Sequence, residues 1–462
     1  MNTDENIILL TDSYKPSHWR QYPDKTTGIY GFLESRGGVF PEILFFGLQY
    51  FLKKYLSGSV VSKENIIEAR ELLGEHFGNS SIFNEAGWTR ILEHHGGRLP
   101  VRIKAVPEGT VVPNSNVLLT MESTDPGLAW LPNYLDPLLT ELWYPCTAAT
   151  QSRAMKDIIL EYLEETGDTG LIDFKLHDFG FRGSTSPESA GIGGAAHLVN
   201  FKGSDNLTAI RMLRRLYSEP MAGFSIPAAE HSTITSWGKQ HEVDAFRNML
   251  EQFPEGLAAV VSDSYDIFHA CRTLWGKELR EKVLGRNGTL VVRPDSGDPA
   301  TVVVEVLNIL GEAFGTEMNA KGYKVLDPHV RVIQGDGIDL HSLPLILSHM
   351  KRHGWSADNV AFGSGGGLLQ KMNRDTNRFA FKCSAAEIDG AWKDDIMKDP
   401  VTDPGKRSKA GRMKLIQENG TLRTVCESAP GEDRLVTVFE NGRLLQDWSL
   451  AEIRDRANDK NE

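Results

Sequence analysis

The chain of 462 residues has few cysteines, no long apolar run and fewer basic than acidic residues. Its cysteines are widely separated and none has the CxxC spacing of a zinc or redox motif: Cys146, Cys271, Cys383 and Cys426. Such a pattern is typical of a reducing compartment and argues against a structural zinc site or a disulfide-stapled scaffold. We therefore expect a cytoplasmic protein whose stability depends on a packed core.

No stretch approaches the roughly 18 uninterrupted apolar residues of a membrane-spanning helix. The N-terminus places Asp4 and Glu5 before a brief apolar run from Ile7 to Leu10, so it has neither the basic region nor the apolar core of a secretion signal. We expect neither membrane insertion nor secretion, and no membrane partner.

Lys and Arg number 50 against 62 Asp and Glu, which gives a net charge of -12 and opposes non-specific attraction to nucleic acid or anionic lipid. We expect no nucleic-acid partner, and any phosphate-binding site must be a local feature. Hydrophobic residues make up 40% of the chain and charged residues 24%, which excludes disorder as the main state. At roughly 150 residues per domain, the length predicts two or three domains.

The pattern of expected elements changes twice along the chain. Before about residue 170 it predicts α+β structure, including a helix over Lys63 to Phe77 capped by Ser62 and a strand over Val101 to Ala105. From about residue 171, short apolar runs alternate with helical patterns, which indicates parallel βα units and an α/β fold. Beyond residue 412, the pairs Asn419-Gly420 and Asn441-Gly442 predict two β-hairpins.

Five predicted strands of the α/β region end in loops rich in Gly, Asp, Arg and Ser. These loops are 177–183 (HDFGFRG), 262–264 (SDS), 293–297 (RPDSG), 334–337 (QGDG) and 363–367 (GSGGG). Gly and Asp are common in any loop, so a single loop of this kind has little meaning. Ligands bind at the C-terminal ends of parallel strands, however, and five such loops at one edge predict a polar site there.

The last loop, GSGGG, precedes a helical pattern from Leu368 to Arg374. Bare backbone N–H groups at a helix N-terminus favour a bound phosphate, and Arg374 and Lys382 could add cationic contacts. The loop is not a P-loop, because GxxxxGK[ST] is absent. A simple glycine-rich linker is the alternative interpretation.

Arg293 with Asp295, and Asp336 between two glycines, suit a phosphorylated sugar. Carboxylates accept hydrogen bonds from ribose hydroxyls, while a guanidinium binds phosphate oxygens. Structural ion pairs would explain the same residues. Phe179 and Phe181 lie in an otherwise polar loop, where an aromatic ring either stacks on a flat ligand or fills the core.

Two further motifs point away from other activities. Residues 191–196 (GIGGAA) formally match a dinucleotide-binding fingerprint, yet no strand precedes them, so we expect small residues that allow close helix packing. His231 has no Cys or His at metal-ligand spacing, and neither a nucleophile–base pair nor an HExxH motif is present. A hydrolase has little support.

Ten segments spread over nearly the whole chain together resemble the nicotinamide phosphoribosyltransferase family, within the type II phosphoribosyltransferases. The segments are TDSYKPSH (11–18), LHDFGFRG (176–183), NFKGSD (200–205), IPAAEHSTITSWGK (226–239), VVSDSYDI (260–267), VRPDSGDP (292–299), RVIQGDGID (331–339), AFGSGGGLLQKMNRD (361–375), FKCS (381–384) and KDPVTDPGKRSK (398–409). So many long motifs make the resemblance highly specific.

The resemblance implies an irregular α/β barrel over residues 171–382. It also implies a second, α+β sandwich-like domain built from both chain ends, residues 1–170 and 383–462, and a homodimer with shared active sites. The implied reaction transfers phosphoribose from 5-phosphoribosyl 1-pyrophosphate to nicotinamide and yields nicotinamide mononucleotide and pyrophosphate in NAD salvage. Mg²⁺ would accompany the pyrophosphate, and ATP would act as a stimulating co-substrate.

The resemblance also assigns roles to single residues on the phosphoribosyl side. The expected contacts of the pyrophosphate are Arg182, His231 and Arg293, and those of the ribose are Asp295 and Asp336 with Gly335. Pro294 is a further expected substrate-binding residue. The expected seat of the 5′-phosphate is Gly365 and Gly366, assisted by the partner subunit's Arg374 and the partner subunit's Lys382. His231 is the expected site of phosphorylation by ATP, and Asp295 or Asp263 could anchor the waters of Mg²⁺.

For the base, the resemblance implies that Phe179 stacks on one face of the pyridine ring and the partner subunit's Tyr14 on the other. Asp205 would accept the carboxamide N–H, although capping the helix that begins near Asn206 is an alternative role for this residue. His231, Arg293 and Asp295 are the expected catalytic residues. The ring nitrogen attacks with a lone pair and no proton, so the absence of a general base fits this chemistry.

Three other functions compete with this one. A nicotinate phosphoribosyltransferase shares fold and co-substrate but must attract a carboxylate, and Asp205 is the feature that discriminates. A pyridoxal-phosphate enzyme would use the GSGGG loop as a phosphate cup and Lys382 as its Schiff base. A non-enzymatic dimeric interaction protein would leave the polar strand ends unexplained.

Overall fold

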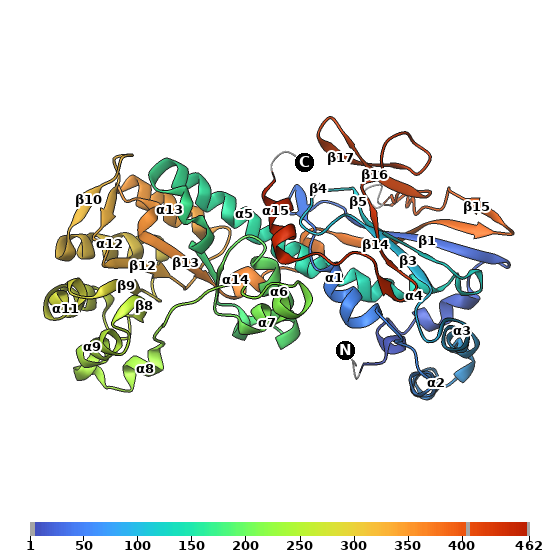
Figure 1. Ribbon diagram of the computed structural model, residues 1–462, viewed down its shortest axis with the longest axis horizontal. Helices are drawn as coiled ribbons and strands as arrows, with labels where there is room; N and C mark the ends of the chain where they lie inside the picture. The colour runs from blue at the N-terminus through green and yellow to red at the C-terminus, as the bar shows by residue number, and fades with distance from the viewer. Residues whose placement is uncertain (1–4, 403–406, 460–462) are drawn as a thin grey trace. The chain divides into compact units, whose positions relative to one another are not determined.

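The structure is a computed structural model that describes residues 5–402 and 407–459. The chain forms two compact units (Figure 1). The antiparallel unit comprises residues 1–150, 215–219 and 372–462, and the parallel unit comprises residues 151–214 and 220–371. Segments from both halves of the chain therefore build the antiparallel unit. The expected domain boundaries at residues 170 and 382 stay a prediction.

The antiparallel unit is built on a seven-stranded sheet of order β15-β14-β1-β5-β3-β18-β19. Its strands are β1 (Thr26–Ser35), β3 (Val101–Ala105), β5 (Val117–Ser123), β14 (Phe379–Ile388), β15 (Ala391–Lys393), β18 (Val436–Glu440) and β19 (Arg443–Leu444). Strand β1 pairs antiparallel with β14, which places Phe32 opposite Lys382. Segments that are more than 300 residues apart thus meet in the middle of one sheet.

Helices lie on one side of this sheet, and a hairpin of β16 and β17 lies on the other (Figure 1). The helices are α1 (Leu48–Phe51), α2 (Lys63–Phe77), α3 (Glu85–His95), α4 (Leu131–Thr140) and α15 (Leu450–Asn458), and α5 (Trp143–Thr166) begins in this unit. The smaller strands are β2 (Glu42–Leu44), β4 (Val111–Pro113), β16 (Met413–Glu418) and β17 (Thr421–Cys426).

Local sequence signals explain several of these elements. Helix α2 begins with a capping box in which the Ser62 hydroxyl accepts the N–H of Asn65 and the Asn65 side chain accepts the N–H of Ser62. The alternating burial of β3 matches its alternating sequence. Asn419 and Asn441 have φ of 52° and 51°, and each is followed by a glycine with positive φ, as two-residue hairpin turns require. The predicted helix, strand and hairpins are confirmed.

The parallel unit contains a six-stranded, all-parallel half-barrel sheet of order β7-β6-β13-β12-β9-β8. Its strands are β6 (Leu176–Asp178), β7 (Gly203–Ser204), β8 (Glu255–Val261), β9 (Asn287–Arg293), β12 (Val330–Gln334) and β13 (Val360–Ser364), with a small pair β10 (Thr316–Met318) and β11 (Lys324–Leu326). The extended segment 224–229 bonds to both edge strands: Ser204 N–H donates to Phe224 O, and Ala229 N–H donates to Ala259 O.

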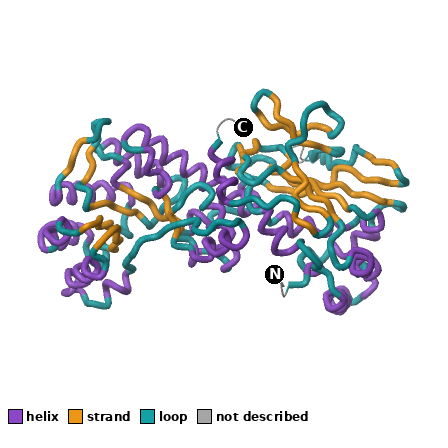
Figure 2. Tube along the Cα trace, viewed as in Figure 1, coloured by secondary structure: helices purple, strands orange, loops and turns teal. Residues whose placement is uncertain are grey.

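The helices of the parallel unit lie around these strands (Figure 2). They are α6 (Pro187–His197), α7 (Leu207–Leu216), α8 (His231–Thr235), α9 (Glu242–Gln252), α10 (Ile267–His269), α11 (Arg280–Leu284), α12 (Pro299–Phe314), α13 (Ser342–Arg352) and α14 (Gly366–Leu369). The core lies between strands and helices, where Phe246 of α9 stacks on Trp275 with ring centroids 4.4 Å apart. The predicted alternation of strands and helices is confirmed.

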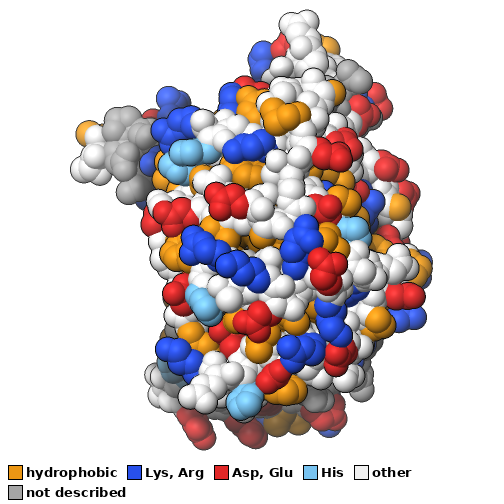
Figure 3. Space-filling model, turned by 90° about the vertical axis from the view of Figure 1, so that its left-hand side faces the viewer, with side chains coloured by type: hydrophobic (Ala, Val, Ile, Leu, Met, Phe, Trp, Pro, Cys, Tyr) orange, Lys and Arg blue, Asp and Glu red, His pale blue; other side chains and the backbone are white. Residues whose placement is uncertain are grey.

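Charges of both signs are interspersed on the face that Figure 3 turns toward the viewer, without a large patch of one sign. Within the described residues, no helix combines the length and the apolar character needed to cross a bilayer. All four cysteines are free thiols. These observations agree with the sequence-based expectation of a core held together by packing.

Candidate active site

The polar loops predicted from the sequence meet at the carboxyl edge of the parallel sheet. The ring of Phe179 packs onto Gly363, where an added Cβ would lie 2.0 Å from the ring. An added Cβ at Gly335 would lie 3.4 Å from both the Phe179 ring and Oδ1 of Asp295. Beneath the ring lie buried inward-facing side chains of β8, β9 and β12. The loops after β6, β9, β12 and β13 therefore surround one site.

Asp205 lies directly after β7, beside the loop that carries Phe179. Its backbone N–H donates to the carbonyl of Asp178 at 3.0 Å, and its Oδ1 accepts a hydrogen bond from the hydroxyl of Ser225. The side chain of Asn206, not that of Asp205, accepts the N–H of Ala209 in the first turn of α7. The helix-cap alternative for Asp205 is therefore wrong, because its carboxylate is exposed and free of that role.

His231 is not an isolated histidine. Its Nε2 lies 3.0 Å from Oδ1 of Asp263, whose side chain is only 5% exposed. The other oxygen of Asp263 accepts the backbone N–H of Asp295 at 3.2 Å and the hydroxyl of Ser296. One carboxylate thus connects His231 to the loop after β9. The sequence did not reveal this partner, because 32 residues separate His231 from Asp263.

Arg293 and Asp295 form a two-point ion pair. Nε and Nη2 of Arg293 lie 3.2 and 2.9 Å from the two oxygens of Asp295, and both side chains are largely buried. The two residues thus form the ion pair that was the alternative interpretation of the sequence. The pair leaves the Nη1 edge of the guanidinium for an additional anion. Between them, Pro294 is buried, whereas Asp336 in the next loop is exposed.

The GSGGG loop follows β13 as predicted, but the helix after it is shorter than the sequence indicated. Helix α14 ends at Leu369, and Asn373 caps a separate 3-10 turn at Arg374–Thr376. The predicted helix over 368–374 is therefore wrong. Open space surrounds the position that a Cβ on Gly366 would occupy, so the backbone of this loop is accessible. Arg182 in the 3-10 turn Phe181–Gly183 is likewise exposed.

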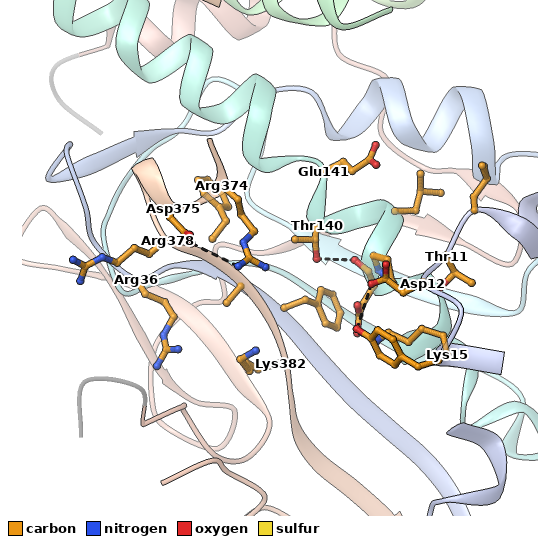
Figure 4. Close-up of a pocket in the computed structure, with 18 of the residues that line it drawn as sticks. Thr11, Asp12, Lys15, Arg36, Thr140, Glu141, Arg374, Asp375, Arg378 and Lys382 are labelled. Carbon is orange, nitrogen blue, oxygen red and sulfur yellow. Dashed lines mark hydrogen bonds and ion pairs between the residues drawn. The ribbon is translucent and has the colours of Figure 1, made fainter. Parts of the chain in front are cut away.

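The antiparallel unit holds the other three predicted site residues: Tyr14, Arg374 and Lys382. They line one pocket of about 1160 Å³ (Figure 4). Arg36, Arg374, Arg378 and Lys382 lie toward one end of this pocket, and Asp12, Lys15 and Glu141 lie toward the other. The sequence did not indicate Arg36 and Arg378, because no motif distinguishes them from other charged residues, and Lys15 was visible only as part of the segment TDSYKPSH.

The cationic end of the pocket holds several basic groups close together, although Arg36 pairs with Glu34 at 3.5 Å and Arg374 with Asp375 at 3.6 Å. Lys382 is partly buried on β14, and this burial, together with repulsion from Arg36, Lys398 and Arg374, lowers the pKa of its ammonium group. Several cations that repel one another favour an anionic ligand, which would relieve the repulsion. At the opposite end, Nζ of Lys15 is satisfied by Asp136 at 2.6 Å.

The acidic residues do not assemble a metal site on their own. In the described part of the chain, no group of three His, Cys, Asp or Glu side chains could hold a metal ion. Both oxygens of Asp295 face Arg293, and both oxygens of Asp263 already accept hydrogen bonds or contact His231. A divalent ion would therefore need most of its ligands from a bound anion and water.

Solved structures share this arrangement of a parallel half-barrel and an antiparallel unit. Nicotinate-nucleotide pyrophosphorylase from Pyrococcus furiosus matches with a TM-score of 0.62 and 17% identity, over 99% of this chain and 96% of that one. Human nicotinic acid phosphoribosyltransferase matches with a TM-score of 0.61 and 18% identity, over 97% and 93% of the two chains. At these identities the likeness shows a shared fold: the chain is an α/β protein with a parallel half-barrel sheet.

Sequence relatives narrow this class to one family. Residues 174–443 match the family described as "Nicotinate phosphoribosyltransferase (NAPRTase) family", and residues 6–103 match "Nicotinamide phosphoribosyltransferase, N-terminal domain". The curated nicotinamide phosphoribosyltransferase of Xanthomonas campestris pv. campestris is 52% identical over 98% of both chains. That of Acinetobacter baylyi is 32% identical over 98% of this chain and 97% of its own. The chain belongs to the nicotinate phosphoribosyltransferase family and is an enzyme of it, which confirms the resemblance.

Proposed function

We propose that the enzyme transfers phosphoribose from 5-phosphoribosyl 1-pyrophosphate to nicotinamide, yielding nicotinamide mononucleotide and pyrophosphate for NAD salvage. The observation that carries this proposal is the 52% identity, over 98% of both chains, with a relative named for this activity. The matching N-terminal nicotinamide phosphoribosyltransferase domain supports the same substrate. Membership of the family leaves the pyridoxal-phosphate and non-enzymatic alternatives without support.

In this reaction the bond from C1 of the ribose to the pyrophosphate oxygen breaks, and a bond from C1 to the ring nitrogen of nicotinamide forms. The ring nitrogen supplies the electron pair, and the pyrophosphate leaves with the pair of the broken bond, so no proton is transferred. Positive charge develops on the ribose and negative charge on the leaving group. Catalysis then depends on positioning and on electrostatic stabilisation by fixed charges.

The base lies between Phe179 and an aromatic side chain of a second subunit, the partner subunit's Tyr14. The carboxylate of Asp205 accepts the carboxamide N–H. Support comes from the place of Asp205 beside the Phe179 loop, and from Ser225, which holds Oδ1 and leaves Oδ2 as the acceptor. The rival nicotinate would bring a second carboxylate to the same position, where like charges repel.

Arg182, His231 and Arg293 contact the pyrophosphate, with the Nη1 edge of Arg293 directed to phosphate oxygens. The ribose hydroxyls donate to Asp295 and Asp336, alongside Pro294 and Gly335. The bare backbone of Gly365 and Gly366 seats the 5′-phosphate, with the partner subunit's Arg374 and the partner subunit's Lys382 as its cations. Burial lowers the pKa of Lys382 and repulsion from Arg36, Lys398 and Arg374 adds to this shift, and such a group of neighbouring cations supports an anion at that place.

The pyrophosphate and water would hold most of the coordination sphere of Mg²⁺, with Asp263 or Asp295 bonding to its waters, and the ion would supply neutralisation of charge on the leaving group. ATP stimulates the reaction by phosphorylating His231. Asp263 supports this role, because a carboxylate that accepts the N–H of Nε2 favours the tautomer whose Nδ1 carries a lone pair for attack on phosphorus. The bond between the γ-phosphorus and the bridging oxygen then breaks, and ADP leaves.

The functional assembly is a homodimer whose active sites take the parallel unit of one subunit and the antiparallel unit of the other. In this assembly the half-barrel and the segment 224–229 form an irregular barrel within a domain of residues 171–382. Residues 1–170 and 383–462 form the sandwich-like domain. Free thiols at all four cysteines support a cytoplasmic location.

The test is to supply purified enzyme with 5-phosphoribosyl 1-pyrophosphate, Mg²⁺ and either nicotinamide or nicotinic acid, with and without ATP, and to identify the product by chromatography and mass. We expect nicotinamide mononucleotide and stimulation by ATP. A preference for nicotinic acid would reassign the enzyme to the nicotinate branch of the family.

A further inference from the structure

One fully buried acid of the parallel unit has no part in the reaction described above. Asp178 is the last residue of β6, and its side chain is fully buried. Burial raises the pKa of this carboxyl group to about 6, and hydrogen bonds from Gly180 and Asn206 act against that rise. A buried carboxylate is costly unless its oxygens are bonded, so the identity of its partners is informative.

The two oxygens of Asp178 bond to two different loops. Oδ1 accepts the backbone N–H of Gly180 at 2.7 Å, and Oδ2 accepts Nδ2 of Asn206 at 2.9 Å. The second hydrogen of the same amide donates to the carbonyl of Ala190 at 2.8 Å, and its Oδ1 accepts the N–H of Ala209 at 3.2 Å. Both side chains are buried with partners for every polar atom, a condition under which such a network has one geometry.

Each member of this pair is the chain neighbour of a residue that recognises the base. Asp178 precedes Phe179 directly, and Asn206 follows Asp205 directly. The backbones are joined as well, since Asp205 N–H donates to Asp178 O at 3.0 Å. The Asp178–Asn206 contact therefore fixes the distance between the neighbouring residues Phe179 and Asp205.

The glycine-rich segment 191–196 makes room for this pair. A Cβ on Gly194 of α6 would lie 2.6 Å from Oδ2 of Asp178, 2.5 Å from Nδ2 of Asn206 and 2.7 Å from Cβ of Ala209. A Cβ on Gly191 would lie 2.8 Å from the Met212 side chain of α7. The expectation of close helix packing at this motif is confirmed, and the motif also admits a buried polar contact.

We propose that the Asp178–Asn206 pair, seated against Gly194, positions Phe179 and Asp205 relative to each other and so sets the affinity for nicotinamide. This inference rests on the proposed function, because it takes Phe179 and Asp205 as the groups that bind the base. Neither member of the pair touches the substrate, so both are positioning residues. Asp205 is exposed, and the next residue in its loop, Asn206, is buried and bonded to Asp178. A misplacement of about 1 Å can reduce a rate by roughly 100-fold, so partial loosening should have a clear kinetic effect.

The test compares two matched asparagine variants. Asn206→Ser keeps an oxygen that can cap Ala209 N–H but loses the amide that joins Asp178 to Ala190. The control is Asn359→Ser, because Asn359 is also fully buried with three bonds, to Leu326 N–H, Lys324 O and Ser356 O. It lies just before β13, at the opposite end of the parallel strands. Melting temperature and the KM and kcat for both substrates are measured for each variant.

We expect both variants to lower the melting temperature by similar amounts, and only Asn206→Ser to raise the KM for nicotinamide, by about tenfold. The KM for phosphoribosyl pyrophosphate should change less than about twofold in either variant. If Asn206→Ser does not fold, Asn206→Thr serves the same purpose, because its hydroxyl can still accept the N–H of Ala209 and it lacks the amide that bonds Asp178 and Ala190. A wild-type KM for nicotinamide in the folded variant would overturn the positioning role alone. A wild-type enzyme that transfers phosphoribose to neither base would overturn the proposed function and this inference with it.

Discussion

Replacing Asp205 by Asn tests how the enzyme distinguishes nicotinamide from nicotinate. The substitution removes one negative charge and keeps a side-chain carbonyl that can accept the carboxamide N–H. Two unit charges about 4 Å apart repel by about 4 kcal/mol at an effective dielectric of 20 and by about 1 kcal/mol in bulk water. Asp205 is exposed in the free enzyme, so the repulsion energy in bulk water is the lower bound. The bound base excludes water from the site, which lowers the effective dielectric and raises the repulsion energy. At about 1.4 kcal/mol per decade, the charge contributes between roughly fivefold and a thousandfold of discrimination.

The assay is kcat/KM for both bases in the wild type and in Asp205→Asn. We expect the ratio to fall by at least about fivefold, mainly because nicotinate gains activity. Ser225→Ala is the matched control, since it frees the carboxylate that Ser225 holds without removing its charge. It should weaken nicotinamide use and still exclude nicotinate. Because Asn206, and not Asp205, caps α7, the melting temperature of Asp205→Asn should hardly differ from that of the wild type. An unaltered ratio in Asp205→Asn would refute the reasoning.

His231→Ala should abolish stimulation by ATP while a slow basal transfer survives, because the transfer itself moves no proton; a basal rate that falls to the blank would contradict this. Mixing Tyr14→Ala chains with Phe179→Ala chains should partly restore activity, since a mixed dimer contains one site with neither defect, and no recovery after confirmed subunit exchange would argue against shared sites. Burial raises the pKa of Glu108 to about 7, above its value of roughly 4.3 in the unfolded chain. The folded protein therefore binds this proton more tightly than the unfolded chain, and the free energy of unfolding falls as pH rises from about 4 to 7. Glu108→Gln removes that loss, so the melting temperature of the variant relative to the wild type should be higher at pH 8 than at pH 5. The same difference between the two proteins at both pH values would contradict the argument.

Elements specified by short-range chemistry were predictable from the sequence. The capping box at Ser62, the alternation in β3 and the two Asn-Gly turns each depend on residues within a few positions. The helix predicted over 368–374 failed for an equally local reason that periodicity does not register. Asn373 accepts the N–H of Asp375 and caps a new turn, and the chain passes from one unit to the other at Met372.

Contacts between distant segments were not predictable from spacing. The loops after parallel strands could be assigned to one edge, because the fold class alone places them there. The partner of His231 lies 32 residues away, and the cations that surround Lys382 come from separate segments of the antiparallel unit. Asp178 was visible only as one more polar residue after a strand, since nothing in a sequence indicates that a carboxylate is buried and paired.

Two glycines, Gly363 and Gly194, leave room for side chains that form or support the candidate site. The Phe179 ring occupies space that any Cβ at Gly363 would fill, so the ring can pack against the half-barrel only because β13 has a glycine at this position. Gly194 admits the Asp178–Asn206 pair in the same way, because a Cβ at this position would collide with both side chains. Phe179 is therefore held by packing beneath it and by a buried polar contact beside it, and Asp205 by that contact and by Ser225. Selectivity for the base then depends on residues that never touch it, because discrimination between a carboxamide and a carboxylate requires the charge of Asp205 to lie at a fixed distance from the stacked ring.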